Sequence, residues 1–284
     1  MNYIFLNLKR FDVPASCGGV NRQPSLPDWG RWVVEQTQDG LRKYFGLEFI
    51  QFLPEAHLIQ ADQARTEGSP VLLGCQGVCR TDTAPGGNFG ALTTGRPASI
   101  ARELGCSWVI IGHCEERADL KEVLGENGPF DPETVDRLLN REVRRAVARG
   151  LKVLLCIGEN SEEQERWDEV LCRQLRVGLE GIDMSQVVIG YEPIWSIGPG
   201  KTPADKPYIT KVARLIKRET GGAAVVYGGG LKVDNAAMLA SIPEMDGGLI
   251  ALTRFQGEIG FYPEEYLQII NTYFDAMKQG GNNG

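Results

Sequence analysis

The sequence predicts an α/β protein built as a single (β/α)8 barrel, with long loops between each strand and the helix that follows it. Short apolar runs of strand length recur along all 284 residues, and helical patterns fill the gaps between them. Such continuously apolar runs are typical of strands buried on both faces. The runs cover residues 3–7, 49–53, 71–75, 108–112, 153–157, 187–192, 224–228 and 248–252. Eight strand–helix units are the number that closes a parallel barrel.

The helical patterns are clearest in three segments. Asp131 is a helix N-cap followed by Pro132 at the first helical position. Pro263 begins a second helix, and a looser apolar stripe starts at Trp29. An open, doubly wound sheet is the alternative fold, but no Gly-rich phosphate loop follows the first strand. The pattern therefore favours the closed barrel.

Gly- and Pro-rich stretches interrupt the pattern without dividing the chain into domains. They cover residues 14–27, 85–97, 125–132 and 257–263, each between a strand and the next helix, as long βα loops do. We therefore expect residues 1–279 to form one barrel domain. Residues 280–284 are expected to be a flexible C-terminal tail.

Composition and charge exclude several classes of protein. The mean hydropathy is −0.21 and no apolar run reaches about 18 residues, so no transmembrane helix is expected. The N-terminus lacks the basic region and the cleavage site of a signal peptide. A net charge of −7 without a basic stretch argues against nucleic acid as a partner. Seven cysteines in no framework spacing suit a reducing cytoplasm.

Residues able to carry chemistry stand where three predicted strands end. Lys9 follows the first strand, His113 the fourth and Glu192 the sixth. In a parallel barrel these ends meet at one face, which carries the active site. A cation, an imidazole and a carboxylate are the groups needed to abstract a proton next to a carbonyl. Each also has a purely structural interpretation. Lys9 would be a solvated loop lysine and His113 a core histidine bonded to a carbonyl, whereas Glu192 would be a carboxylate whose burial without a partner destabilises the fold.

Three motifs, in one order, favour the functional interpretation. They are Gly-His-Cys-Glu-Glu-Arg at 112–117, Tyr-Glu-Pro-Ile-Trp-Ser-Ile-Gly-Pro-Gly-Lys-Thr at 191–202 and Tyr-Gly-Gly at 227–229. With Asn7-x-Lys9 upstream, they resemble the triosephosphate isomerase family over nearly all of the chain. That family is itself a standard example of a neutral catalytic imidazole and of a closing active-site loop.

The resemblance implies a catalytic role for each matching residue. Glu192 is the base that moves a proton between adjacent carbons, and His113 is a neutral imidazole that hydrogen-bonds the enediol oxygens. Lys9, with Asn7 beside it, binds substrate and stabilises the developing oxyanion. Glu115 belongs to the same polar cluster.

The resemblance also implies a phosphate site and a lid, but no cofactor. Backbone N–H groups would bind the phosphate at Gly198, Gly229, Gly230, Ala251 and Leu252, in addition to Asn7 and Lys9. Because backbone dipoles can carry that charge, no metal or other cofactor is expected. The lid, hinged at both ends, would comprise Pro193, Ile194, Trp195, Ser196, Ile197, Gly198, Pro199, Gly200, Lys201, Thr202 and Pro203.

The phosphate site and the lid depart from the family pattern. Ala251 and Leu252 replace a Gly-Gly pair, and Arg254 is a candidate to reach the phosphate instead. Gly230 replaces a serine that latches the closed lid. Pro203 lacks the backbone N–H that would donate to a tyrosine hydroxyl in the closed lid. Both familiar latches are therefore expected to be missing.

A further departure is Cys114, which replaces the family's serine next to His113. Because adjacent side chains rarely converge, we do not expect these two residues to form a nucleophile–base pair. The first βα loop is also longer than is usual in the family.

The resemblance implies an aldose–ketose isomerase of a short sugar phosphate. The simplest substrate pair is dihydroxyacetone phosphate and glyceraldehyde 3-phosphate, interconverted through an enediol(ate) in glycolysis and gluconeogenesis. Two alternatives stay open. The altered phosphate loop and the longer first loop would allow a four-carbon substrate such as an erythrulose phosphate. A sugar-phosphate-binding barrel without turnover is disfavoured, because binding alone does not need a base.

The resemblance also predicts a homodimer. In the family, a glutamate in the loop after the third strand pairs with an arginine of the other subunit. Here Arg96 and Glu116 stand at these two places with their signs exchanged. A complementary double change is explained by a conserved contact, so we predict an Arg96–Glu116 ion pair across the interface.

Overall fold

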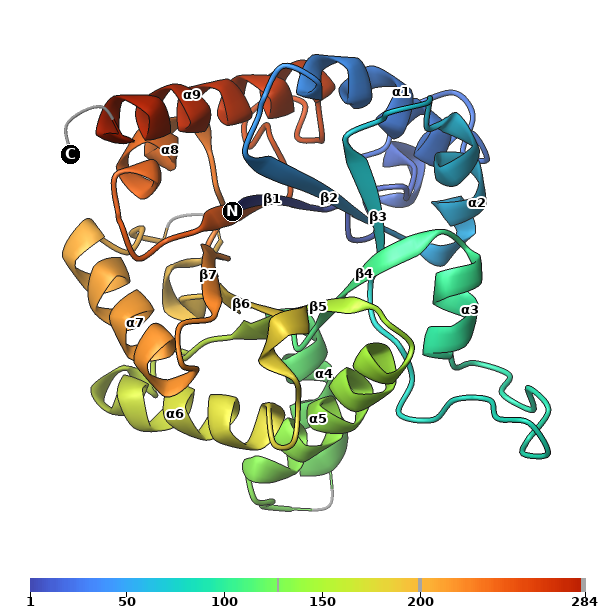
Figure 1. Cartoon of the computed structure of the whole chain (residues 1–284), viewed down its shortest axis with the longest axis vertical. Coiled ribbons are helices and arrows are strands. Elements are labelled where there is room, and N and C mark those ends of the chain that lie inside the picture. Colours follow the sequence, from blue (N-terminus) through green and yellow to red (C-terminus); the bar gives the residue numbers. More distant parts are fainter. Residues whose placement is uncertain (127, 199–200, 282–284) are drawn as a thin grey trace.

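The chain forms a closed barrel of parallel strands surrounded by a ring of helices (Figure 1). A computed structural model describes residues 1–126, 128–198 and 201–281. Within these residues, eight strands pair in chain order, and pairing of the first with the last closes the ring. The strands are β1 (Asn2–Asn7), β2 (Leu47–Leu53), β3 (Val71–Cys75), β4 (Cys106–Ile111), β5 (Lys152–Ile157), β6 (Val187–Tyr191), β7 (Ala224–Tyr227) and β8 (Gly247–Ile250). The predicted (β/α)8 fold is confirmed.

The helices lie outside the barrel, as Figure 1 shows. They are α1 (Trp29–Leu41), α2 (Glu55–Ala64), α3 (Ala98–Glu103), α4 (Cys114–Gly125), α5 (Glu133–Ala148), α6 (Trp167–Gly178), α7 (Lys206–Glu219), α8 (Val233–Ala240) and α9 (Pro263–Gly281). Among the described residues, no helix combines the length and the apolar character needed to cross a membrane.

The strand ends differ from the prediction by a residue or two, and this difference places the candidate residues. Gly112, Glu192 and Gly228 come directly after β4, β6 and β7 rather than inside them. Ala251 and Leu252 likewise follow β8. Since all strands are parallel, these residues gather at the carboxyl end of the barrel.

Two helix boundaries correct the sequence prediction. α5 begins at Glu133 rather than at Pro132, although Asp131 Oδ1 does accept a hydrogen bond from Glu133 N at 2.9 Å. α9 begins at Pro263 as predicted but runs to Gly281, two residues into the segment assigned to the tail. The amphipathic pattern of this helix ends earlier, so its last turn left no signal in the apolar spacing.

The core has two parts, as the alternation of side chains along buried strands requires. Inside the barrel, Phe5, Phe52 and Trp108 pack against one another, with Phe5 and Phe52 stacked at 5.7 Å between ring centroids. Gly74 is required next to them, because a Cβ there would lie 2.4 Å from the Phe52 ring. The larger part of the core lies between the barrel and the helices.

Two of the long βα loops have distinct arrangements. Residues 76–97, between β3 and α3, project away from the barrel in Figure 1, and Phe89 in this loop is 88% exposed. The loop after β1 instead packs down on the barrel. Its Asp12 is buried and contacts His57 of α2, with Oδ2 and Nε2 3.1 Å apart.

Candidate active site

The candidate site is assembled from residues that follow three strands of the barrel. Asn7 is the last residue of β1, and Lys9 lies two residues beyond it. His113 is the N-cap of α4, just after β4, and Glu192 directly follows β6. Their side chains contact one another or a shared neighbour, as the following distances show. The geometry brings together the residues that the sequence predicted from strand ends.

The lysine is held in place by its backbone and by an ion pair. Lys9 has φ +40°, a left-handed conformation that costs a non-glycine residue roughly 1–3 kcal/mol. Asn7 Oδ1 accepts a hydrogen bond from Lys9 N at 3.1 Å, which stabilises this turn. Lys9 Nζ donates to Glu115 Oε1 at 2.6 Å. The ammonium group is therefore positioned beside His113 before substrate arrives.

Gln76 supports the same turn and was not found by sequence reasoning. Its Nε2 lies 3.0 Å from Lys9 O and 3.3 Å from both Asn7 Oδ1 and Phe52 O. It follows β3 directly, so the strand-end rule applied to that strand would have identified it.

The imidazole of His113 is neutral, and its tautomer follows from its hydrogen bonds. Nδ1 accepts from Glu115 N at 3.3 Å, in the first turn of α4, so the proton is assigned to Nε2. Burial, together with the nearby charge of Lys9, lowers the pKa of His113 to about 4 against the opposing effect of Glu115. A neutral imidazole with an Nε2–H can donate a hydrogen bond to an oxygen that becomes negative during a reaction.

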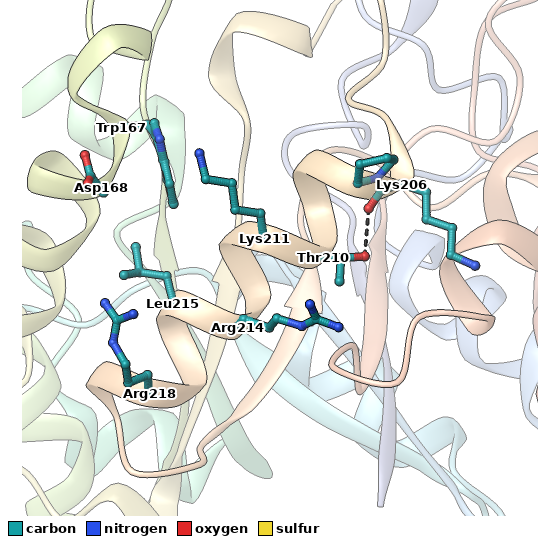
Figure 2. A pocket seen from close by; sticks show the side chains of 9 residues that line it. Trp167, Asp168, Lys206, Thr210, Lys211, Arg214, Leu215 and Arg218 are labelled. Carbon is teal, nitrogen blue, oxygen red and sulfur yellow. Dashed lines mark hydrogen bonds between the residues drawn. The ribbon is translucent and has the colours of Figure 1, made fainter.

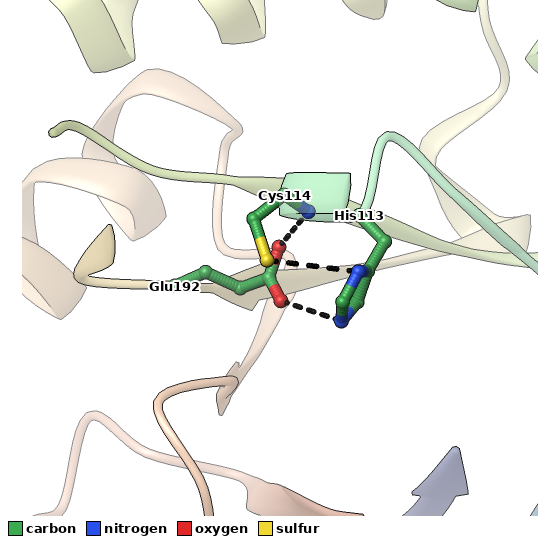
Figure 3. A group of neighbouring side chains, drawn as sticks. All are labelled: His113, Cys114 and Glu192. Atoms are coloured by element: carbon green, nitrogen blue, oxygen red, sulfur yellow. Dashed lines mark hydrogen bonds and ion pairs between the residues drawn. The ribbon is translucent and has the colours of Figure 1, made fainter. Parts of the chain in front are cut away.

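The carboxylate of Glu192 is buried against this imidazole (Figure 3). Oε1 lies 3.1 Å from His113 Nε2, and Oε2 accepts a hydrogen bond from Cys114 N at 2.8 Å. Burial raises the pKa of Glu192 to about 8, although the Cys114 N–H and the charge of Lys9 oppose this shift. A carboxyl group with a pKa near neutrality is a stronger base than an exposed glutamate.

Cys114 and His113 converge, contrary to the prediction that adjacent side chains would not. Cys114 Sγ lies 3.6 Å from His113 Nδ1. They converge because His113 is extended, with ψ 148°, just before the first helical residue. The thiol is nevertheless not activated as a nucleophile, since burial and the charge of Glu192 raise the pKa of Cys114 to about 12.

Glu159 is a second buried carboxylate that sequence reasoning missed. Its Oε1 accepts hydrogen bonds from Tyr191 Oη, Trp195 Nε1 and Tyr208 Oη at 2.9, 2.7 and 3.0 Å. Burial raises the pKa of Glu159. It lies two residues after β5, where a polar residue following an apolar run was again the available signal.

These contacts define the arrangement of the first half of the predicted lid. Ile194–Ser196 form a short 3-10 turn, and Ile194 N donates to Glu159 O at 3.1 Å. Trp195 is therefore tied to Glu159 by its indole. Pro199 and Gly200 of the predicted lid lie outside the described residues.

The predicted phosphate-binding residues surround the same face of the barrel. Gly229 and Gly230 follow β7, and Ala251 and Leu252 follow β8. All four are partly buried. A side chain at Gly229 is excluded because its Cβ would lie 2.4 Å from the Tyr227 hydroxyl.

Arg254 is paired with residues of its own loop and of α9. Its Nε donates to Glu265 Oε1 at 2.7 Å, and its guanidinium lies 3.5 Å from the centre of the Tyr262 ring. To bind the phosphate, Arg254 would have to leave these partners, so its role as a phosphate ligand stays a prediction.

Buried charges behind the site fix the loop that carries His113. Arg117 donates to Gly112 O at 2.9 Å, to Cys156 O at 3.0 Å and to Asp136 Oδ1 at 2.7 Å. It joins the ends of β4 and β5 to α5. Removing one partner of such a buried pair would cost about 3–5 kcal/mol.

With this geometry established, comparison with known proteins identifies the family. The family model described as triosephosphate isomerase matches residues 32–272. The chain belongs to the triosephosphate isomerase family.

Individual members of the family agree with this assignment. The triosephosphate isomerase of Marinobacter nauticus is 30% identical over 86% of this chain and 96% of its own length. That of Chlorobium phaeovibrioides is 36% identical over 68% of this chain and 74% of its own length. A crystal structure of triosephosphate isomerase from Bartonella henselae superposes with a TM-score of 0.71 at 24% identity, over 96% of this chain and 98% of that one. It shares the fold.

A surface groove lies elsewhere, on the outer helices α6 and α7 (Figure 2). It has a volume of about 670 Å³ and several basic residues. All four are engaged: Arg214 with Glu244 at 2.7 Å, Lys211 with the Trp167 ring at 4.3 Å from its centre, Lys206 with Ser241 at 2.7 Å and Arg218 with Glu219 at 2.9 Å. None of its lining residues belongs to the catalytic cluster.

Proposed function

We propose that this chain interconverts dihydroxyacetone phosphate and glyceraldehyde 3-phosphate through an enediolate, with Glu192 as the base. The observation that carries the proposal is the contact between a buried carboxylate of raised pKa and a neutral imidazole, 3.1 Å apart, beside Lys9. Proton transfer between adjacent carbons needs a base for the carbon-bound proton and a donor to the neighbouring oxygen.

In the proposed reaction, ionised Glu192 removes a proton from the carbon next to the carbonyl. The C–H bonding pair forms the C=C bond of the enediolate, and the carbonyl pair moves onto oxygen. His113 Nε2–H and the Lys9 ammonium stabilise that oxygen. Glu192 then returns the proton to the neighbouring carbon, and a proton passes between the two oxygens. One carbon is oxidised while its neighbour is reduced within the same molecule, so the proposed reaction needs no external oxidant or reductant.

The substrate phosphate would bind the amides of the loops after β6, β7 and β8. These amides belong to Gly198, Gly229, Gly230, Ala251 and Leu252. Gly198 and Gly230 have φ +115° and +95°, conformations that let successive N–H groups converge on an anion. Asn7 and Lys9 would contact the rest of the substrate from the opposite side.

The lid of the proposed enzyme is residues 193–203, and Glu159 binds its residues Ile194 and Trp195. Closure over the substrate requires Trp195 to exchange its hydrogen bond with Glu159 Oε1 for other contacts. A closed lid excludes water from the enediolate, which otherwise loses its phosphate. The whole of residues 1–279 would serve as one catalytic domain.

Family membership favours the triose over the four-carbon alternative, since the matched relatives bear the name triosephosphate isomerase. A non-catalytic sugar-phosphate-binding barrel would not need the raised pKa of Glu192 or the neutral His113. We place the enzyme in the cytoplasm, where its seven cysteines would stay reduced.

We also infer that the protein is a homodimer joined in part by Arg96 and Glu116. Within one chain, Arg96 is partly buried and its Nε lies 3.5 Å from Glu55 Oε2. A guanidinium carries five N–H donors, so it can bind a second carboxylate. Glu116 is partly buried, its Oε2 accepts from Gly112 N at 2.5 Å, and it also lies beside Glu142 of α5.

A substrate panel tests the proposed activity. Purified protein would be incubated in D2O with triose or tetrose phosphates, and deuterium incorporation at the reacting carbons would be followed by NMR. Rapid conversion and exchange of the triose phosphates, with little exchange of tetrose phosphates, is expected. Exchange of tetroses alone, or of neither substrate, would contradict the proposal.

A further inference from the structure

Cys114 lies beside the proposed catalytic residues His113 and Glu192, and all three belong to residue types that bind metal ions. Figure 3 shows its thiol, the His113 imidazole and the Glu192 carboxylate facing one another. One ligand atom from each lies within 4.8 Å of the other two. In the part of the chain that the structure describes, no other group of three histidine, cysteine or acidic residues is close enough to hold an ion.

One separation matches that of a tetrahedral zinc site. Bond lengths of about 2.3 Å to sulfur and about 2.0–2.1 Å to nitrogen put two ligands of a tetrahedral ion about 3.5 Å apart, and Cys114 Sγ lies 3.6 Å from His113 Nδ1. Glu192 Oε1 lies 3.1 Å from the other ring nitrogen, Nε2, so binding one ion requires this carboxylate to move toward Nδ1 within a cluster whose ligand atoms already lie within 4.8 Å of one another. The tautomer with the proton on Nε2 leaves the lone pair of Nδ1 available, and its competing contact with Glu115 N is long, at 3.3 Å.

We propose that Cys114, His113 and Glu192 form a binding site for a thiophilic divalent cation, Zn²⁺ in particular, and that the bound cation blocks the active site. Three protein ligands with a fourth position for water are a common zinc arrangement. The thiolate sets the preference, because sulfur ligands select soft ions over Mg²⁺ or Ca²⁺.

The charges around the cluster are compatible with a dication. Binding requires the thiol to release its proton to bulk water, along with the carboxyl proton when Glu192 is protonated. The resulting thiolate and carboxylate together neutralise Zn²⁺. Lys9 acts electrostatically on all three residues, and its charge is already paired with Glu115 at 2.6 Å. Arg117 faces the cluster from behind but is paired with Asp136 at 2.7 Å.

Inhibition by the bound cation depends on the proposed function, whereas binding of the cation does not. A cation on Glu192 and His113 occupies the proposed base and the proposed oxygen ligand together. Zn²⁺ and a substrate analogue should therefore compete. Removing the ion with a chelator should restore turnover, since no covalent bond forms.

The test uses Co²⁺ and Zn²⁺ on the full-length protein, free of metal at the start. Co²⁺ bound to a thiolate gives a near-ultraviolet charge-transfer absorption that carboxylate or imidazole ligands alone do not give. Zn²⁺ affinity would be measured by calorimetry, which needs no activity. The variant is Cys114→Ser, which keeps the size of the side chain, and the control is Cys172→Ser, a partly exposed thiol on α6.

We expect one equivalent of Co²⁺ to give the charge-transfer band in the parent and in Cys172→Ser, but not in Cys114→Ser. Zn²⁺ affinity should fall at least tenfold in Cys114→Ser alone, and a phosphorylated substrate analogue should displace the ion. Absence of the band in the parent, its persistence in Cys114→Ser, or its loss in Cys172→Ser would overturn the proposal. Zinc binding without isomerase activity would instead contradict the proposed function and leave the metal site standing.

Discussion

Both oxygens of Glu192 are engaged by the start of α4: Oε1 lies 3.1 Å from His113 Nε2, and Oε2 accepts the Cys114 N–H at 2.8 Å. The base is therefore held by the residues that precede and begin one helix. To reach a substrate carbon, the carboxylate must give up at least one of these partners. Substrate binding and movement of Glu192 are thus coupled, and five predictions follow from this site and its surroundings.

Replacing Glu192 by glutamine should abolish most turnover while preserving binding. The amide keeps the shape and can still accept the Cys114 N–H, but it cannot take a proton from carbon. General-base catalysis contributes roughly 10²–10⁴-fold, so kcat should fall by about that factor. The dissociation constant of a phosphate-bearing inhibitor should change little. A loss of kcat below about tenfold would refute Glu192 as the base.

The same substitution should stabilise the fold at alkaline pH. The pKa of Glu192 is raised to about 8 from a reference value of 4.5, mainly by burial. A folded-state pKa above the unfolded one means that wild-type stability is full below about pH 4.5 and declines as the pH rises toward 8. Glutamine does not ionise. The stability advantage of Glu192→Gln in urea denaturation should grow between pH 5 and pH 8 and stay constant above that. A constant difference over this range would show that Glu192 is not destabilised by burial.

Replacing Lys9 by methionine should weaken binding and turnover together. Lys9 carries a positive charge beside the developing oxyanion and also attracts the anionic substrate. Km should therefore rise and kcat should fall, in contrast to Glu192→Gln. Arg10→Met is the control, because Arg10 is exposed and pairs with Asp12 at 2.7 Å, away from the catalytic cluster. Steady-state kinetics on triose phosphate would separate the two variants, and equal effects in both would contradict this role.

The altered lid should leak its intermediate, and Pro203→Ala should reduce the leak. A neutral hydrogen bond contributes about 0.5–1.5 kcal/mol, so two missing latches would lower the closed population by roughly 5–150-fold. Restoring serine at position 230 is a poor test, since Gly230 has φ +95° and any side chain there is strained. Pro203→Ala supplies the missing N–H alone.

The leak would be measured as the ratio of phosphate-elimination product to isomerised product. This ratio should fall in Pro203→Ala and stay unchanged in Pro243→Ala, a proline in an exposed turn. If the parent turns over rapidly with little by-product and Pro203→Ala changes nothing, other contacts hold the lid closed.

Reversing the charge of Arg96 should dissociate the proposed dimer. Arg96→Glu would place a carboxylate opposite Glu116 of the partner, and like charges across an interface are repulsive. Analytical ultracentrifugation should show a dimer for the parent and a monomer, or a much weaker dimer, for Arg96→Glu. Arg218→Glu is the control, because Arg218 is largely exposed on α7 and pairs with its neighbour Glu219. A parent that sediments as a monomer would contradict the interface.

The sequence was a sufficient guide to the fold and to the location of the candidate catalytic residues. The eight apolar runs correspond to the eight strands of the described chain within about two residues at either end. Burial on both faces leaves this signal because most side chains of such a strand are apolar, with Gln51 of β2 as a buried exception. Lys9, His113 and Glu192 stood out because the residues just past the carboxyl ends of barrel strands line the active site.

Other parts of the site depended on contacts between residues far apart in the chain. Glu159 and Gln76 also follow strands, but only the folded barrel shows that they bind Trp195 and the Lys9 turn. Arg254 was a plausible phosphate ligand by position along the chain. Its pairing with Glu265, on the helix that closes the barrel, was decided by packing that no local pattern records.

By itself, the sequence determined the barrel, the order of its strands and the identity of the residues at its carboxyl end, because apolar periodicity and strand ends are local properties. Only the tertiary structure decided the electrostatic state of those residues. The pKa of Glu192 rises and that of His113 falls because separate segments of the chain exclude water from both. The approach of Cys114 to His113 likewise follows from the backbone angles at the start of α4. Charge and reactivity depend on surroundings that exist only after the chain has closed on itself.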